Sequence, residues 1–479
     1  MFEEKVIDES KQGTALSPNF HISNSKKLFL ESYGCAMNFS DSEIVASILA
    51  NEGYITTNLV EEADLILLNT CSIREKAEET VRKRLTTFKT IKKQKSSLKI
   101  GVLGCMAERL KTKFLEEEHL VDLVVGPDAY KDLPNLLQEI SEGRDAINVL
   151  LSKEETYADI SPVRLGGNGI TAFVTITRGC DNMCTFCVVP FTRGRERSRD
   201  PHSIVNECLE LAENGYKEIT LLGQNVDSYL WYGGGPKKDF EKASELQQAT
   251  AVTFSQLLDM VAMAIPEVRI RFSTSNPQDM SLDAVKIMAK HKNICNYIHL
   301  PVQSGSTSVL KRMNRQHTRE QYMELIINIK KIVPDVALSY DLITGFCGET
   351  EQEHQDTLTM MEFVEYDFGY HFAYSERPGT PAHKKMEDDI PSEIKQRRLE
   401  EIIEMQLKLS HKRMQSYVGK VHEVLIDGDS KKDKNYWKGR ISQNAVVVFP
   451  KTKDTKLGDF VEVFVEDCTK ATLKGKIVG

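Results

Sequence analysis

The sequence lacks any apolar run long enough to cross a membrane, and it lacks a start in which basic residues precede an apolar stretch. A membrane-spanning helix needs about 20 consecutive apolar residues, and a secretory leader needs a basic start before its apolar core. The opening residues, MFEEKVIDESKQGTALSPNF, are acidic and polar instead. We therefore expect a cytoplasmic protein with no membrane segment, in which residues 1–25 form a disordered tail.

An excess of positive charge is also missing, because 62 Lys and Arg stand against 70 Asp and Glu, a formal net charge of −8. This balance excludes a uniformly basic nucleic-acid coat, although a local basic patch can still bind RNA. The 41% of hydrophobic residues is typical of a globular protein. A chain of 479 residues is too long for one core, so we expect several domains in a monomer.

Disulfides are not expected either, although the chain has ten cysteines. Thiols stay reduced in the cytoplasm, so metal ligation, catalysis or burial explains them better than pairing does. Three of them, Cys35, Cys71 and Cys105, each follow an apolar run that is typical of a strand. Strands that alternate with helices form parallel sheets, and ligands gather where such strands end. We therefore expect these three thiols to meet at one sheet edge.

Helices are expected just beyond the first two of these cysteines. Ser40 with Glu43, and Ser72 with Glu75, have the Ser-x-x-Glu spacing of a capping box. In a capping box the serine and glutamate side chains bond to each other's backbone N–H groups at a helix start. The spacing therefore predicts helix N-termini at these two serines.

The rest of the pattern divides the chain into domains. Residues 26–150 are predicted to form an N-terminal parallel α/β domain, and the polar stretch 151–169 a linker. Six strand-like runs alternate with helical segments over 170–412, which predicts a partial (β/α)6 barrel and a connecting helix. Residues 233–250 interrupt this pattern as an inserted surface loop. Short β-rich runs over 413–479 predict a small antiparallel β-barrel.

A second group of cysteines lies in RGCDNMCTFC, which places Cys180, Cys184 and Cys187 in a C-x3-C-x2-C array. Structural zinc needs four protein ligands, and no fourth lies nearby, because His202 and Cys208 come after a run of arginines. Three thiolates suit a four-iron cluster that leaves one iron open to an outside ligand. The remaining cysteines are expected to be buried in cores; they are Cys208, Cys295, Cys347 and Cys468.

The motifs around both cysteine groups resemble the radical S-adenosylmethionine methylthiotransferase family. They are YGCAMN, NTCSIREKA, GCMAER, RGCDNMCTFCVVPFTRGRERSR, LLGQNV, FSTSNP, PVQSGS and SERPGTPA, and the resemblance covers nearly everything after the tail. Two positions depart from the family pattern. Cys347 stands where proline is common, and Ala36 stands where glutamine is usual. Neither departure removes a cysteine of either group.

The resemblance implies two [4Fe-4S] clusters and S-adenosylmethionine as cofactors. The C-x3-C-x2-C cysteines would hold the cluster that binds and cleaves S-adenosylmethionine, using an electron from a low-potential donor. The three strand-end cysteines would hold an auxiliary cluster that carries the sulfur. NTCSIREKA and CTFCVVPFTRGRERSR resemble the branch that converts N6-(dimethylallyl)adenosine at position 37 of tRNA to its 2-methylthio derivative. The adenine C2–H has no useful acidity, so a radical route is needed there.

Cofactor contacts are expected from residues near the carboxyl ends of the predicted barrel strands. In the superfamily pattern Phe186 contacts the adenine of the cofactor, with plain core packing as its alternative. The other candidates could each merely cap the next helix; they are Gln224, Ser275, Gln303 and Asp341.

RNA contacts are predicted in two places. The run RGRERSR contains Arg193 and Arg195, which either contact phosphates or the cofactor carboxylate, or form a solvated charge run. Residues 413–479 hold 13 Lys and Arg against 9 Asp and Glu, and by resemblance they form a TRAM domain, a module associated with RNA binding. Lys432 and Lys438 are its candidate phosphate contacts. Its aromatic residues that could stack on unpaired bases are Tyr436, Trp437 and Phe449, although core packing is the favoured role for Phe449.

Three other functions remain open at this point. The first is methylthiolation of threonylcarbamoyladenosine in tRNA. The second is methylthiolation of an aspartate in a ribosomal protein, which the basic C-terminal segment disfavours. The third is an iron-sulfur RNA-binding protein without catalysis, which would not cleave S-adenosylmethionine.

Overall fold

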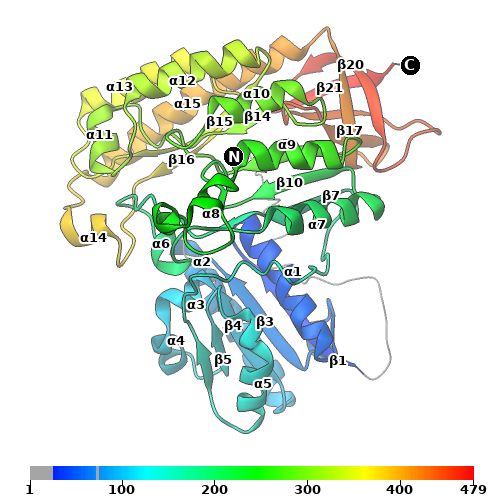
Figure 1. Cartoon of the computed structure of the whole chain (residues 1–479), viewed down its shortest axis with the longest axis vertical. Helices are drawn as coiled ribbons and strands as arrows, with labels where there is room; N and C mark the ends of the chain where they lie inside the picture. The colour runs from blue at the N-terminus through cyan, green and yellow to red at the C-terminus, as the bar shows by residue number, and fades with distance from the viewer. Residues whose placement is uncertain (1–24, 72–74, 479) are drawn as a thin grey trace.

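A six-stranded parallel sheet begins the computed structural model, which describes residues 25–71 and 75–478 (Figure 1). The strand order is β2-β1-β3-β4-β5-β6, and each neighbouring pair is parallel. This arrangement confirms the predicted N-terminal α/β architecture. Its strands are β1 (Lys26–Ser32), β2 (Tyr54–Thr56), β3 (Leu65–Thr70), β4 (Lys99–Gly104), β5 (Leu123–Val125) and β6 (Ala146–Asn148).

Helices cover both faces of this sheet because alternate strand residues point to opposite sides. Leu28, Leu65 and Leu67 face one core, while Phe29 and Ile66 face the other. The helices of the first core are α1 (Ala36–Asn51) and α5 (Leu133–Ser141). Those of the second are α2 (Glu75–Gln94), α3 (Cys105–Leu110) and α4 (Thr112–Glu117).

The predicted capping box at Ser40 is wrong. Helix α1 already begins at Ala36, with Cys35 as its N-cap, so Ser40 and Glu43 lie inside the helix. Glu43 pairs with Arg164 across 2.9 Å and accepts a hydrogen bond from the backbone N–H of Leu165. Glu43 therefore contacts the 151–169 segment and does not cap a helix. Ser72 of the second predicted box lies outside the described residues.

Six further parallel strands form two three-stranded sheets, ordered β13-β10-β7 and β14-β15-β16. A parallel bridge between Ile270 and Ile294 joins the sheets, and one apolar core spans both. The expected partial barrel is therefore present. Its strands are β7 (Thr171–Thr175), β10 (Glu218–Leu222), β13 (Arg269–Ser273), β14 (Tyr297–His299), β15 (Ala337–Thr344) and β16 (Phe368–Ala373).

The barrel helices run between and outside these strands. They are α6 (Val189–Thr192), α7 (Pro201–Glu213), α9 (Phe254–Ala264), α10 (Leu282–Lys290), α11 (Thr307–Arg312), α12 (Arg319–Ile332), α13 (Glu351–Val364) and α14 (Pro381–Lys385). An antiparallel pair, β8 (Thr177–Arg178) and β9 (Arg197–Ser198), frames the loop that carries the C-x3-C-x2-C cysteines. A second pair, β11 (Leu230–Trp231) and β12 (Val252–Thr253), brackets the insertion, which contains α8 (Glu245–Ala249).

A five-stranded closed barrel ends the chain, in the order β17-β18-β19-β21-β20. Its neighbouring pairs are antiparallel except β19 with β21, which is parallel. Its strands are β17 (Val421–Asp429), β18 (Tyr436–Arg440), β19 (Val446–Pro450), β20 (Phe460–Cys468) and β21 (Thr472–Ile477).

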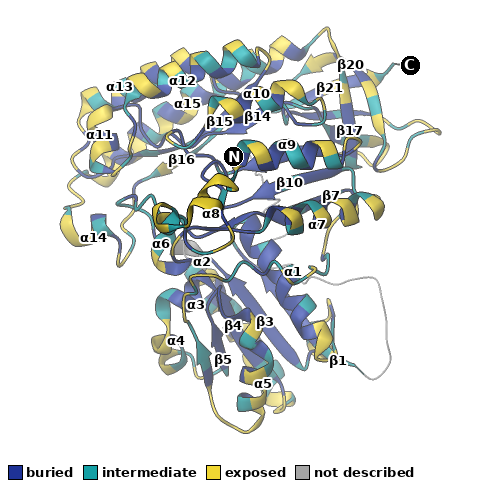
Figure 2. Ribbon diagram, viewed as in Figure 1, coloured by how far each residue is buried: buried dark blue, intermediate teal, exposed yellow. Residues whose placement is uncertain are grey.

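Helix α15 (Ser392–Tyr417) joins the two barrels physically. Ile402 and Leu409 pack in the large barrel core, while Met414 and Tyr417 pack in the small one. Figure 2 shows the strands of the large sheets as buried and the outer helix faces as exposed. None of the helices within 25–71 and 75–478 combines the length and apolarity that a bilayer span requires.

Candidate iron-sulfur and cofactor site

The three strand-end cysteines lie at the carboxyl edge of the N-terminal sheet, as the sequence predicted. Cys35 caps α1, Cys71 follows β3 directly, and Cys105 is the first residue of α3. Gly34 makes the approach of the first two loops possible. A Cβ on Gly34 would lie 2.3 Å from the Cβ of Cys71, and its φ of +108° favours glycine.

The chemistry of these three side chains fits an iron-sulfur ligand set. A hydrogen bond with Cys71 lowers the pKa of the Cys35 thiol to about 6, while burial raises the pKa of Cys105. The N-terminus of the 16-residue helix α1 lies directly at Cys35 and offers a positive dipole end to an anionic cluster. Within the described residues, no three His, Cys, Asp or Glu side chains are grouped tightly enough for a single metal ion. Three buried or half-buried thiols at one sheet edge suit the ligand set of an iron-sulfur cluster.

The second cysteine group lies in the loop between β8 and β9. The backbone N–H of Cys180 donates to the carbonyl of Gly194, and that of Cys187 donates to the carbonyl of Cys184. Burial raises the pKa of the Cys187 thiol to about 12. Arg315 donates to the sulfur of Cys184 at 3.6 Å. The three thiols thus lie in one short loop, and Arg315, which follows α11, brings a cation to it.

The two cysteine groups face each other. Helix α6, which begins two residues after Cys187, contacts helix α3, which begins at Cys105. Arg193, directly after α6, donates from Nε to the sulfur of Cys105 at 3.2 Å. Ala36 also packs against Leu222 at the end of β10, which adds an apolar contact between the N-terminal domain and the large barrel. A small reactant between the loops would be close to both groups.

The RNA contact predicted for Arg193 is wrong, because its side chain is only 3% exposed. Its Nη2 donates to Asn38 and pairs with Asp41, each at 2.9 Å. Burial lowers the pKa of Arg193, but the facing Cys105, Asp41 and Cys35 raise it to a net value well above the usual range. Arg195 is 45% exposed and pairs with Asp181 across 3.3 Å, so it stays a candidate for an outside contact.

Of the predicted cofactor residues, Phe186 lies in the C-x3-C-x2-C loop and Gln224 contacts the segment that leads into it. Gln224 accepts a hydrogen bond from the backbone N–H of Gly179 at 2.5 Å, and its own Nε2 is buried without a partner among the described residues. Phe186 packs edge-on against Phe346, with ring centroids 6.4 Å apart. Ser275 donates to Asp227 at 3.1 Å.

Gln303 and Asp341 are neighbours on the second sheet. The backbone N–H of Gln303 donates to the carbonyl of Asp341 at 2.9 Å, and Gln303 has a φ of +74°. Sequence analysis missed two histidines there. His299 lies 3.6 Å from the Asp341 carboxylate, and burial lowers the pKa of His371 to about 4. His299 ends β14 and His371 lies on β16, and this position toward the ends of barrel strands was the signal that could have found them.

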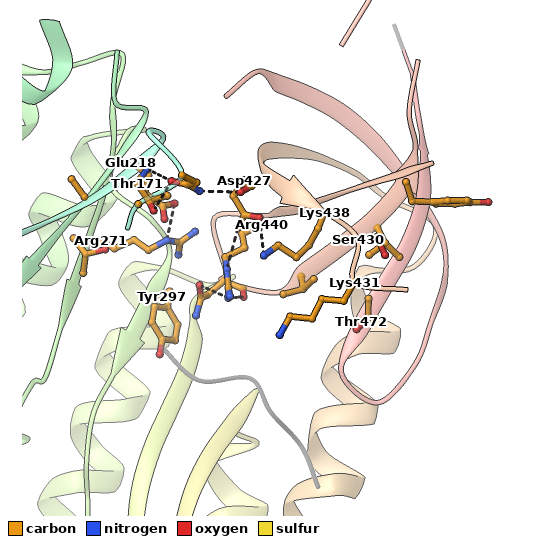
Figure 3. A pocket seen from close by; sticks show the side chains of 18 of the residues that line it. Thr171, Glu218, Arg271, Tyr297, Asp427, Ser430, Lys431, Lys438, Arg440 and Thr472 are labelled. Atoms are coloured by element: carbon orange, nitrogen blue, oxygen red, sulfur yellow. Dashed lines mark hydrogen bonds and ion pairs between the residues drawn. The ribbon is translucent and has the colours of Figure 1, made fainter. Parts of the chain in front are cut away.

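A cavity of about 1380 Å³ lies between the large barrel and the small one. Figure 3 shows Arg271 and Tyr297 from the large barrel on one side and Lys431, Lys438 and Arg440 from the small barrel on the other. Of the predicted RNA residues, Lys432, Lys438 and Tyr436 line this cavity. Phe449 is fully buried in the small-barrel core, and Trp437 is packed against that core. Phe449 therefore packs in the core, as the sequence favoured, and is not available for stacking.

Three family models match consecutive parts of the chain. They are the uncharacterized protein family UPF0004 at residues 27–126, the radical SAM superfamily at 174–361 and the TRAM domain at 415–478. The structure of a radical S-adenosylmethionine methyltransferase, TsrM from Kitasatospora setae, aligns with a TM-score of 0.54 and 14% identity over 75% of each chain. That likeness concerns the fold.

Full-length relatives are much more similar. A protein of Christiangramia forsetii is 66% identical and one of Flavobacterium johnsoniae is 65% identical, each over 99% of both chains. Both are named tRNA-2-methylthio-N(6)-dimethylallyladenosine synthase. The chain therefore belongs to the tRNA-2-methylthio-N(6)-dimethylallyladenosine synthase family, within the radical S-adenosylmethionine superfamily.

Proposed function

We propose that the protein transfers a methylthio group to C2 of N6-(dimethylallyl)adenosine at position 37 of tRNA, in the cytoplasm and as a monomer. The observation that carries this proposal is a contact between the two cysteine groups, which come from different domains. Arg193, from the loop of the second group, donates a hydrogen bond to the sulfur of Cys105 in the first. One group suits generation of a radical and the other suits storage of sulfur. The names of the full-length relatives support the same substrate.

The cofactors follow partly from the superfamily, which implies one [4Fe-4S] cluster and S-adenosylmethionine. We assign that cluster to Cys180, Cys184 and Cys187, and a second, auxiliary cluster to Cys35, Cys71 and Cys105. When bound, this machinery supplies the carbon-centred radical and the sulfur that an unactivated C2–H requires. A low-potential electron donor is needed as a partner.

The chain's own residues would position the cofactor and keep water out. Gln224 has a buried amide donor with no acceptor in the described part of the chain, so it is suited to a polar group of the cofactor. Gln303 and Asp341 offer polar groups from β15 and its neighbouring loop, and Ser275 is held in place by Asp227. The edge of Phe186 packs on Phe346, which leaves it suited to contact an adenine ring.

The RNA is proposed to bind along the cavity between the two barrels. Lys432 and Lys438 line the cavity together with the aromatic ring of Tyr436. Cationic side chains beside an aromatic ring suit single-stranded RNA, in which phosphates attract the charges and unpaired bases stack. Arg195 could add a phosphate contact near the cluster loop.

The proposal is tested by anaerobic reconstitution with iron and sulfide, followed by incubation with S-adenosylmethionine, a reductant and tRNA. The mixture should contain tRNA with N6-(dimethylallyl)adenosine and tRNA with threonylcarbamoyladenosine, so that mass analysis of nucleosides separates the two substrates. We expect the methylthio group only on the dimethylallyl nucleoside. Methylthiolation of threonylcarbamoyladenosine alone would overturn the substrate assignment.

Two cysteine variants separate the roles of the two groups. Cys184→Ala should abolish cleavage of S-adenosylmethionine and formation of product together, because it removes a ligand of the radical-generating cluster. Cys71→Ala should retain measurable cofactor cleavage while losing the methylthio product. Cys208→Ala, which alters a buried cysteine of the large barrel core, is the matched control. Normal product formation by the Cys71 variant would disprove the auxiliary assignment.

A further inference from the structure

The guanidinium of Arg193 contacts the Cys105 sulfur, Asn38 and Asp41. It belongs to the loop that carries Cys187, yet these three partners belong to the N-terminal domain. The guanidinium therefore crosses the boundary between the two cysteine groups. Such a bridge fixes the distance between them more firmly than apolar contact alone, because charge-assisted hydrogen bonds are directional.

One edge of this guanidinium has no partner among the residues that the structure describes. The Nη1 atom of Arg193 is buried and donates no hydrogen bond to any described group. Leaving a charged donor unsatisfied in a side chain that is 3% exposed is costly. The cost is removed if an anion occupies the space beside Nη1. Nε of the same guanidinium donates to the sulfur of Cys105 at 3.2 Å, so the anion would lie beside the cluster that Cys105 holds.

We propose that Arg193 is a positioning residue that binds an anionic sulfur ligand, sulfide or a thiolate, at the auxiliary cluster through its unpartnered Nη1 edge. This inference rests on the proposed function, since it requires a cluster on Cys35, Cys71 and Cys105. Nε holds the cluster ligand Cys105, and Nη2 is fixed by Asn38 and Asp41, so Nη1 is oriented for the exogenous sulfur.

Two measurable consequences follow from this arrangement. A cation and a hydrogen bond at the sulfur atoms favour the reduced, more negative cluster, so they raise its reduction potential. The same contacts strengthen binding of an added sulfur anion. Lysine cannot replace arginine here, because one ammonium group cannot hold Cys105, Asp41 and a third acceptor in a fixed planar geometry.

The test uses the full chain with Cys180, Cys184 and Cys187 all changed to alanine, so that only the auxiliary cluster is reconstituted. Its reduction potential is measured by a redox titration followed by electron paramagnetic resonance, and its spectrum is followed during titration with methanethiol. In this background Arg193→Gln should lower the reduction equilibrium constant about tenfold, about 59 mV for one electron, and weaken methanethiol binding about tenfold.

The controls separate this role from a structural one. Arg144→Gln removes the same charge from an exposed side chain of the N-terminal domain, and should change neither the potential nor methanethiol binding. Arg193→Lys keeps the charge and should restore part of the potential without restoring methanethiol binding. If Arg193→Gln does not load iron, the double variant Asp41→Asn with Arg193→Gln, which removes both charges of this pair, is titrated instead.

The outcomes distinguish this inference from the proposed function. If Arg193→Gln or its double variant has the reference potential and methanethiol affinity, the Arg193 inference is overturned while the auxiliary cluster stands. If the reference protein with the C-x3-C-x2-C cysteines removed holds no cluster, the auxiliary assignment fails and the inference fails with it. A lower potential with weaker methanethiol binding supports both.

Discussion

His317 is a buried titratable residue whose effect can be measured apart from the clusters. Its side chain is 7% exposed, both ring nitrogens lack partners among the described residues, and its ring lies beside Tyr322. Burial, with Arg315 nearby, lowers its pKa to about 3. Because the unfolded residue titrates near 6.5, the unfolded state takes up a proton below that pH and the folded state does not.

Stability should therefore fall as the pH drops from 6.5 toward 3. Between pH 7 and pH 5, His317 should cost the wild type about 2 kcal/mol of unfolding free energy. His317→Leu should lose less stability over this range, as measured by urea unfolding followed by circular dichroism at both pH values. Equal losses in the variant and the wild type would show that His317 is protonated in the folded protein.

At the residue scale the cysteines were predictable and the arginines were not. Each cysteine group is visible as a local pattern, because a strand end or a short spacing brings its members together. Arg193 is buried, and one of its hydrogen-bond partners, Asn38, lies 155 positions earlier in the chain. No local feature of RGRERSR distinguishes it from the exposed Arg195. Long-range partners of this kind decide burial, and a single sequence does not display them.

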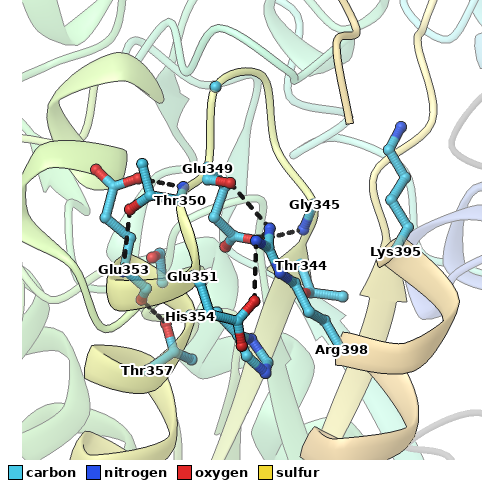
Figure 4. A network of polar contacts seen from close by, with 12 residues as sticks. Thr344, Gly345, Glu349, Thr350, Glu351, Glu353, His354, Thr357, Lys395 and Arg398 are labelled. Carbon is cyan, nitrogen blue, oxygen red and sulfur yellow. Dashed lines mark hydrogen bonds and ion pairs between the residues drawn. The ribbon is translucent and has the colours of Figure 1, made fainter. Parts of the chain in front are cut away.

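Among the elements, the loop between β15 and α13 is held by helix α15. Figure 4 shows Arg398 of α15 reaching Glu349, whose carboxylate also accepts the backbone N–H of Gly345 at 2.6 Å. Arg398 and Glu349 are both buried and pair across 2.9 Å. Arg398→Met should cost about 3 to 5 kcal/mol of unfolding free energy, because it leaves a buried carboxylate without its cation.

The double variant Arg398→Met with Glu349→Gln is the control for this pair. It removes both charges, and glutamine can still accept from Gly345, so the loss of stability should be clearly smaller than in the single variant. Thermal unfolding of the three proteins under one buffer condition measures the difference. Equal losses in the single and double variants would show that the ion pair contributes little.

Element types were predictable where periodicity was strong, and helix starts were not. The six barrel strands and the small C-terminal barrel follow from alternating apolar patterns. Helix α1 starts four residues before Ser40 because Gly34 turns the chain sharply at Cys35. The parallel pairing of β19 with β21 also could not be predicted from the sequence, because the relative direction of two strands depends on how the whole small barrel closes.

For the whole molecule, the proposed RNA surface predicts a salt effect. Changing Lys432 and Lys438 together to glutamine should make tRNA binding weaker and less dependent on salt, with a slope of log affinity against log salt smaller by about 1 to 2. Filter binding or fluorescence anisotropy at several salt concentrations measures the slope. Lys286 and Lys408 lie exposed on α10 and α15, so their double glutamine variant is the matched control. An unchanged slope would assign Lys432 and Lys438 no phosphate contact.

The buried ion pairs between the first two domains limit how this protein can recombine with its relatives. Asp41 of the N-terminal domain pairs with Arg178 and Arg193 of the large barrel across 2.8 and 2.9 Å. Asp128 likewise pairs with Arg197. A hybrid gene that joined either domain to an unrelated one would leave these buried charges without their partners at the interface. The two domains are therefore expected to be inherited, and to diverge, as a single unit.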